Sequence, residues 1–233
     1  GVYALAGPNA RALLKDIVKD ADPATVLGNK RFPWLSYRDI ELGMCPVRAI
    51  RVAYTGELGW ELHYPIEFGR YLWDLIWSVG EKHGLKGVGA RAQNWLRQEK
   101  SYRAFGNELG RDATPLEAAL DRFVDLGKDF RGKAKMLETG IRAKCVTLLI
   151  DGPSDTDPWG KEALIHDGQK IGRLTSGGYS VAFGKQIGMG YVRPDLAEPG
   201  TKLKVKIQLK EWDAVVTEDS PFDPTNARIR VDG

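Results

Sequence analysis

Residues 47–65 have the sequence VRAIRVAYTGELGWELHYP, which contains two candidate strands. Apolar and basic residues alternate over 47–54, which is the pattern of a half-buried strand. A second apolar run covers residues 60–64 and stops at Pro65, while Thr55-Gly56-Glu57 supplies a turn between the two. The stretch therefore predicts a β-hairpin.

Helical spacing dominates on either side of this hairpin. Apolar residues recur at helical intervals over 67–83, and Gly84 is placed to end that helix. Further helices are predicted from about Pro8, over 90–102, and over 115–123 with Thr114 as the N-cap residue. The first part of the chain is thus predicted to mix helices with a sheet.

The pattern changes after about residue 140. Short strands are predicted at 145–150, 187–192 and 202–209, separated by Gly, Pro and Asp. Strands at this spacing favour a small all-β barrel or sandwich. We therefore expect an α+β fold with a boundary near 128–142, divided into domains 1–135 and 136–233.

Composition restricts the function classes. The 233 residues carry a net charge of +3, with 42% hydrophobic and 28% charged residues, as in ordinary globular proteins. Basic and acidic residues are interspersed, so neither a nucleic-acid-binding stripe nor a membrane span is expected. The opening residues lack a signal-peptide pattern, and we expect a cytoplasmic protein, or a mitochondrial matrix protein if the source is eukaryotic.

Cysteine and histidine show no metal-binding pattern. Cys45 and Cys145 are far apart and favour two free thiols, although a disulfide stays open as the alternative. His63, His83 and His166 have no ligand spacing to one another or to the cysteines, so no metal site is predicted.

Two acids flank the Gly-containing turn within the string YTGELGWE of residues 54–61. A carboxylate that leaves water needs hydrogen-bond donors, and a paired set of N–H donors suits it best. The alternative from the residues alone is a hairpin whose acids are simply solvated.

The string closely resembles the YTGE-x-G-x-E segment of the glycine cleavage T-protein family, in the form found in dimethylglycine and sarcosine dehydrogenases. The resemblance implies that Glu61 binds the ring N–H and amino group of the pterin of tetrahydrofolate. It also implies that Tyr54 lies beside the pterin, while Glu57 shapes the turn.

A second segment, Gly89-Ala90-Arg91 continuing through LRQEK to Tyr102, resembles the family's ARDSLRLEKGY helix. An arginine near a helix N-terminus opposes the helix dipole, which is easier to understand if it faces an anion or a carbonyl. The resemblance implies that Arg91 contacts folate. Arg97 and Glu99 are expected to form a structural charge pair.

A third segment, TSGGYS at 175–180 followed by Gly184-Lys185 and GMGYV, resembles the family's C-terminal barrel domain. The residues themselves predict that Gly177 and Gly178 form a tight turn between strands. The spacing does not match a phosphate-binding loop.

The family resemblance implies tetrahydrofolate-dependent transfer of an aminomethyl or methyl group, with folate and a methylated amine as small-molecule partners. The family's catalytic Asp precedes the element GPNARALL, with which this chain begins, so no catalytic residue is assigned. FAD is expected only if a flavin module lies upstream. Two alternatives stay open: a non-catalytic folate-binding or regulatory module of the same fold, and a folate-dependent S- or O-demethylase.

Overall fold

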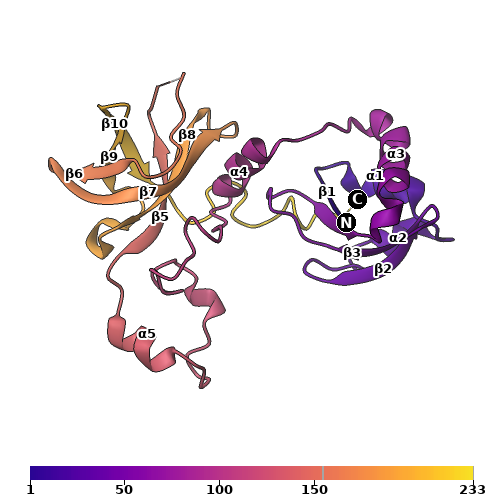
Figure 1. The fold of residues 1–233 in the computed structure, drawn as a ribbon, viewed down its shortest axis with the longest axis horizontal. Coiled ribbons are helices and arrows are strands. Elements are labelled where there is room, and N and C mark those ends of the chain that lie inside the picture. Colours follow the sequence, from indigo (N-terminus) through magenta and orange to yellow (C-terminus); the bar gives the residue numbers. More distant parts are fainter. Residues whose placement is uncertain (154, 233) are drawn as a thin grey trace. The chain divides into compact units, whose positions relative to one another are not determined.

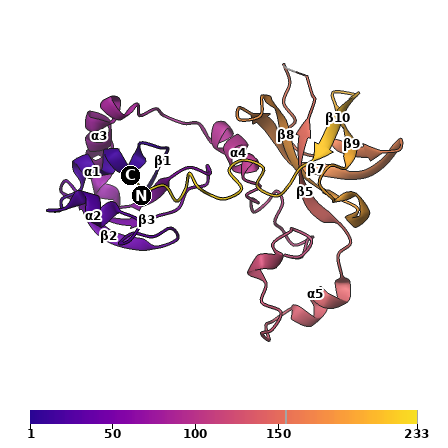
Figure 2. The same cartoon turned by 180° about the vertical axis from the view of Figure 1, so that it is seen from behind.

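The computed structural model describes residues 1–153 and 155–232. The chain forms two compact units. Unit 1 comprises Gly1–Gln93 together with the segment that begins at Asp223, and unit 2 comprises Asn94–Phe222. Figure 1 and Figure 2 show the elements of both units from opposite sides.

The described part of unit 1 contains an antiparallel four-stranded sheet in the order β1-β4-β3-β2. Its strands are β1 (Val2–Ala6), β2 (Tyr37–Leu42), β3 (Cys45–Ile50) and β4 (Gly59–His63). The predicted hairpin is present as the pair β3–β4, in which Ile50 lies opposite Glu61. Residues 51–58 form a longer loop than the predicted three-residue turn.

One face of this sheet packs against helices. They are α1 (Ala10–Ile17), α2 (Pro23–Leu27) and α3 (Gly69–Gly80), with the 3₁₀ turns η1 (Ile66–Phe68) and η2 (Glu81–His83) around α3. The core between them contains Leu14, Leu62 and Leu72, none of which is exposed. Gly84 ends η2 with φ +71°, as its predicted stop position requires.

The helix predicted over 90–102 is α4 (Ala90–Glu99), which ends three residues early. Ser101 takes a positive φ of 53°, which interrupts helical geometry. The helix predicted over 115–123 is wrong: the chain forms turns there, followed by the 3₁₀ helix η3 (Asp121–Phe123). Thr114 does cap the first turn, accepting from the Glu117 N–H at 3.2 Å.

The rest of unit 2 is built around a closed barrel with the strand order β10-β5-β8-β7-β6-β9 among the described residues. Helix α5 (Lys133–Thr139) and the 3₁₀ helix η4 (Pro194–Leu196) accompany it. The strands are β5 (Lys144–Ile150), β6 (Ala163–His166), β7 (Gln169–Ser180), β8 (Lys185–Val192), β9 (Lys202–Ile207) and β10 (Lys210–Val216). Inward-facing Leu148, Leu174 and Val205 are fully buried, which confirms the predicted barrel.

The glycine pair of the barrel does not form the predicted tight turn. Gly177 and Gly178 lie inside β7, opposite Gly188 and Ile187 of β8. A Cβ atom on Gly177 would lie 2.7 Å from Pro158, and one on Gly178 would lie 2.0 Å from the Trp95 ring. The glycines are needed because other segments pack directly on this strand.

Candidate functional site

Glu61 lies on the face of the unit 1 sheet that the helices do not cover. Its neighbours in β4, Trp60 and Leu62, are 1% and 0% exposed, because successive side chains of a strand point to opposite faces. Glu61 and His63 consequently share the other face, where their side chains are 44% and 38% exposed. The burial of Trp60 thus fixes which way Glu61 points.

Trp60 is held by an unusual set of neighbours. The guanidinium carbons of Arg11 and Arg51 lie 5.7 Å and 5.8 Å from its ring, and Phe32 meets it edge-on with centroids 6.1 Å apart. Guanidinium groups at this distance are attracted to the indole face. Burial, together with nearby Arg11, lowers the pKa of Arg51 to about 10, which leaves it charged at neutral pH.

The C-terminal segment of unit 1 completes this arrangement. Arg11 Nη1 donates to the Val231 carbonyl at 2.7 Å, and Arg51 Nη2 donates to the Ile229 carbonyl at 3.2 Å. Glu57, in the loop before β4, accepts from Arg228 Nη1 at 2.6 Å. The loop between β3 and β4 is therefore tied to residues far along the chain.

The Glu61 carboxylate has one side-chain partner on its own strand. His63 Nε2 lies 3.1 Å from Glu61 Oε2. On the flanking strands Ala4 lies opposite Glu61 in β1 and Ile50 lies opposite it in β3. Both of these neighbours are apolar, and a carboxylate can accept about four hydrogen bonds.

The other two predicted site residues lie outside this sheet. Tyr54 is in the loop 51–58 and 38% exposed, and the register puts Ile50 rather than Tyr54 opposite Glu61. Arg91 is exposed in the first turn of α4. The sheet itself therefore presents Glu61, and the joint action of the three residues stays a prediction.

A cavity of about 1000 Å³ in unit 1 is lined by residues from both faces of this sheet, among them Val47 of the core. His63, Arg48 and Asp39 line it, whereas Glu61 does not. Asp39 holds Arg48 in a bidentate pair at 2.8 and 3.0 Å, which lowers the pKa of Asp39. His63 thus touches both the cavity and Glu61.

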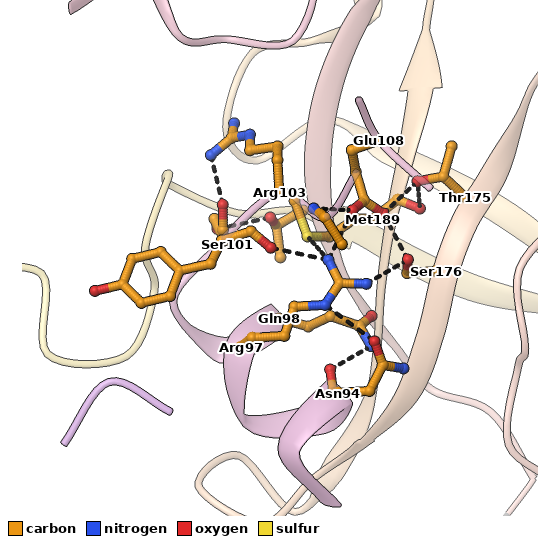
Figure 3. A network of polar contacts seen from close by, with 12 residues as sticks. Asn94, Arg97, Gln98, Ser101, Arg103, Glu108, Thr175, Ser176 and Met189 are labelled. Carbon is orange, nitrogen blue, oxygen red and sulfur yellow. Dashed lines mark hydrogen bonds and ion pairs between the residues drawn. The ribbon is translucent and has the colours of Figure 1, made fainter. Parts of the chain in front are cut away.

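Unit 2 contains a buried charge pair, drawn in Figure 3, that the sequence analysis missed. Arg97 Nη1 lies 2.7 Å from Glu108 Oε2, and both side chains are 0% exposed. The expected pair of Arg97 with Glu99 is wrong, because Glu99 instead accepts from the Ser180 hydroxyl and the Ala182 N–H.

Glu108 is fully satisfied by this network. Its Oε1 accepts from the hydroxyls of Thr175 and Ser176 at 2.7 and 2.6 Å, and its Oε2 also accepts from the Ala104 N–H. Arg97 also donates to Asn94 and Ser176 (Figure 3). A further bond from Arg97 goes to the Tyr102 carbonyl. The Arg97 and Glu108 charges are paired with each other, and the network joins α4 residues from Asn94 onward to β7.

The cysteines agree with the expected free thiols. Cys45 lies buried in unit 1 and Cys145 lies buried in unit 2. Burial raises the pKa of the Cys145 thiol to about 12, so it stays protonated and unreactive. Within residues 1–153 and 155–232, no helix is long and apolar enough to cross a membrane.

Comparison with known proteins identifies the family of this chain. The family model described as the GCVT N-terminal domain matches residues 1–128, more than half of the chain. The chain belongs to the glycine cleavage T-protein family. The glycine cleavage T-protein C-terminal barrel domain matches residues 144–223, which contain the barrel of unit 2.

Individual T-protein relatives cover the chain almost completely. Mitochondrial dimethylglycine dehydrogenase of Rattus norvegicus is 36% identical over 100% of this chain, which corresponds to 27% of that protein. An aminomethyltransferase of Natranaerobius thermophilus is 33% identical, over 95% of this chain and 60% of its own length. The chain therefore spans less than two thirds of these relatives.

A solved relative supports the same T-protein fold. The crystal structure of the glycine cleavage system aminomethyltransferase T from Bartonella henselae superposes with a TM-score of 0.79 at 26% identity. The match covers 95% of this chain and 59% of that one. The α+β fold with a C-terminal barrel is thus shared with a T-protein.

Proposed function

We propose that the chain is the tetrahydrofolate-binding part of an enzyme that transfers a one-carbon unit, either T-protein-like or linked to dehydrogenation of a methylated amine. The observation that carries the proposal is Glu61, held half-exposed on the uncovered sheet face by the buried Trp60. Relatives named aminomethyltransferase and dimethylglycine dehydrogenase support the reaction class. The domain division 1–135 and 136–233 belongs to the same proposal.

The carboxylate acceptor of Glu61 fits the donors of a folate. A pterin presents a ring N–H and an amino group side by side, and a carboxylate accepts such a pair with two parallel hydrogen bonds. Glu61 keeps enough lone pairs for this after its contact with His63. Bound folate would supply the nitrogen that takes up the one-carbon unit.

The remaining predicted residues would act on other parts of the folate. Arg91 carries the cation suited to the carboxylates of the glutamyl end, and Tyr54 would lie beside the pterin. By fixing both ends, the chain would hold the accepting nitrogen in place for a methylated amine donor, which raises the rate through proximity. The chain assigns no residue to the proton transfer.

The first experiment is a tetrahydrofolate titration of the full-length gene product, wild type beside Glu61→Gln. The variant keeps the shape but removes the charge, so we expect the wild type to bind and the variant to lose about 1–3 kcal/mol of binding free energy. Isothermal titration under reducing, oxygen-free conditions measures both affinities.

Glu41→Gln is the matched control, because Glu41 is an exposed carboxylate of β2 that pairs with exposed Lys19 at 3.1 Å. It should bind as the wild type does. Wild-type binding with no loss in Glu61→Gln would contradict the pterin assignment. No binding at all would favour a structural or regulatory module instead.

A further inference from the structure

His63 occupies a position that connects Glu61 with the neighbouring cavity. It follows Glu61 by two residues in β4, so both side chains leave the same face of the sheet. Its Nε2 atom lies 3.1 Å from Glu61 Oε2, and its ring lines the cavity of about 1000 Å³. No predicted role used this residue.

The other charged groups near His63 are either occupied or distant from Glu61 in the register. Arg48 lies opposite His63 in β3, but Asp39 of β2 binds its guanidinium through both oxygens. Val2, an apolar residue, lies opposite His63 in β1. On the described part of this sheet face, the His63 imidazole thus lies within hydrogen-bond distance of the Glu61 carboxylate.

A half-exposed glutamate has a cost to overcome before it can bind a ligand. Three side-chain torsions must be fixed, and the loss of their conformational entropy opposes binding. A donor on a rigid strand removes part of that freedom beforehand. His63 can do this while leaving most lone pairs of Glu61 open, because a carboxylate accepts about four hydrogen bonds.

We propose that His63 is a positioning residue for Glu61: its Nε2–H holds the carboxylate plane in the orientation that accepts the paired N–H donors of a pterin. This inference rests on the proposed folate function. It assigns the Nε2–H tautomer to His63, or its doubly protonated form, because only these donate from Nε2.

The test is tetrahydrofolate affinity of the full-length protein with His63→Leu and His63→Gln. Leu removes the donor, and we expect the dissociation constant to rise roughly 5- to 20-fold. Gln places an amide N–H near the same point and should restore affinity to within about threefold of the wild type. A role in packing alone would not show this rescue.

A double-mutant cycle locates the effect. If His63 acts through Glu61, His63→Leu should change the affinity of the Glu61→Gln protein by less than about twofold. His83→Leu is the matched control, because His83 also pairs with a carboxylate, that of Asp16, elsewhere in unit 1. It should leave folate affinity unchanged.

Each outcome separates this inference from the proposed function. Folate binding that is lost in Glu61→Gln but unchanged in His63→Leu would overturn the positioning role and leave the function intact. Equal loss in His63→Leu and His63→Gln, or an additive loss in the double variant, would also overturn it. Absence of binding in the wild type would remove both proposals.

Discussion

Glu117 of unit 2 takes part in several hydrogen bonds at once. Its Oε2 accepts from the Thr114 N–H at 2.8 Å while its own N–H donates to the Thr114 hydroxyl, which is a reciprocal capping box. Arg142 adds a bidentate contact at 2.8 and 3.0 Å. The hydrogen bonds from Arg142, followed by those from Thr114, lower the pKa of Glu117 to about 2.

This shift predicts an acid-dependent loss of stability. Because the folded pKa lies below the ordinary 4.5, Glu117 stabilises the fold fully above about pH 4.5, and this contribution is lost as the pH falls toward 2. We expect Glu117→Gln to lose about 2 kcal/mol of unfolding free energy at pH 7, allowing for solvent around Arg142. Urea unfolding at pH 7 and pH 3 measures it.

The difference in unfolding free energy between Glu117→Gln and the wild type should be smaller at pH 3 than at pH 7. Glu138→Gln serves as the control, since Glu138 pairs with Lys135 where both side chains are more than two thirds exposed. This control variant should change the unfolding free energy little at either pH. A gap that stays constant from pH 7 to pH 3 would contradict the assigned ionisation.

At this scale the sequence predicts local contacts better than distant ones. The Thr114 cap follows from its position before Pro115, and alternation along a strand puts Glu61 and His63 on one face. The sequence predicts a pair between Arg97 and Glu99, but the partner of Arg97 in the structure is Glu108. Glu108 binds it from a loop eleven residues away, and no periodic pattern indicates such a contact.

Strand β7 shows why an element can be placed correctly and still be misinterpreted. The glycine pair Gly177 and Gly178 predicts a turn, because glycine is common in turns. In the structure they are mid-strand residues, and Gln98 Nε2 donates to the Gly177 carbonyl at 3.3 Å. The requirement for glycine comes from packing on top of the strand, which pattern alone does not show.

Gly177→Ala therefore tests close approach rather than turn geometry. The added methyl group would lie 2.7–2.8 Å from backbone and ring atoms of Pro158. The backbone at Pro158 would have to move to make room for it. We expect a loss of about 1–3 kcal/mol of unfolding free energy. Gly110→Ala is the control in the same unit, because its Cβ would meet no atom within 4 Å. Equal stability of both variants in thermal unfolding would contradict the packing argument.

The elements that were predicted well are those whose periodicity is strong. α3 with its flanking turns, β5, β8 and β9 lie within a few residues of their predicted bounds. The helix predicted after Thr114 does not form, although Thr114 caps the first turn. Its apolar residues Leu116 and Leu120 are only half-buried, so they provide little packing for a helix. Tertiary contacts, absent from the pattern, decided its conformation.

The whole chain is organised by contacts of very long sequence separation. Arg11 and Val231 are 220 residues apart and share a hydrogen bond inside unit 1. Asn29 Nδ2 donates to the Arg230 carbonyl at 2.7 Å, and the Ile229 side chain is 2% exposed. Composition and spacing could not predict this return of the C-terminal segment, because its own residues are mostly polar and irregular.

Ile229→Ala tests whether this segment stabilises the unit that carries Glu61. Loss of a buried isoleucine side chain costs about 2–4 kcal/mol, and unit 1 should bear the cost because Ile229 belongs to it. Amide hydrogen exchange should therefore accelerate in β4, around Trp60 and Glu61, and stay unchanged in β8 of the barrel. Val231→Ala, with a side chain 43% exposed, provides the control and should cost less than half as much. If exchange in β8 rose as much as in β4, the two units would share one cooperative transition. Unchanged exchange in β4 would show that the C-terminal segment does not support the strand that carries Glu61.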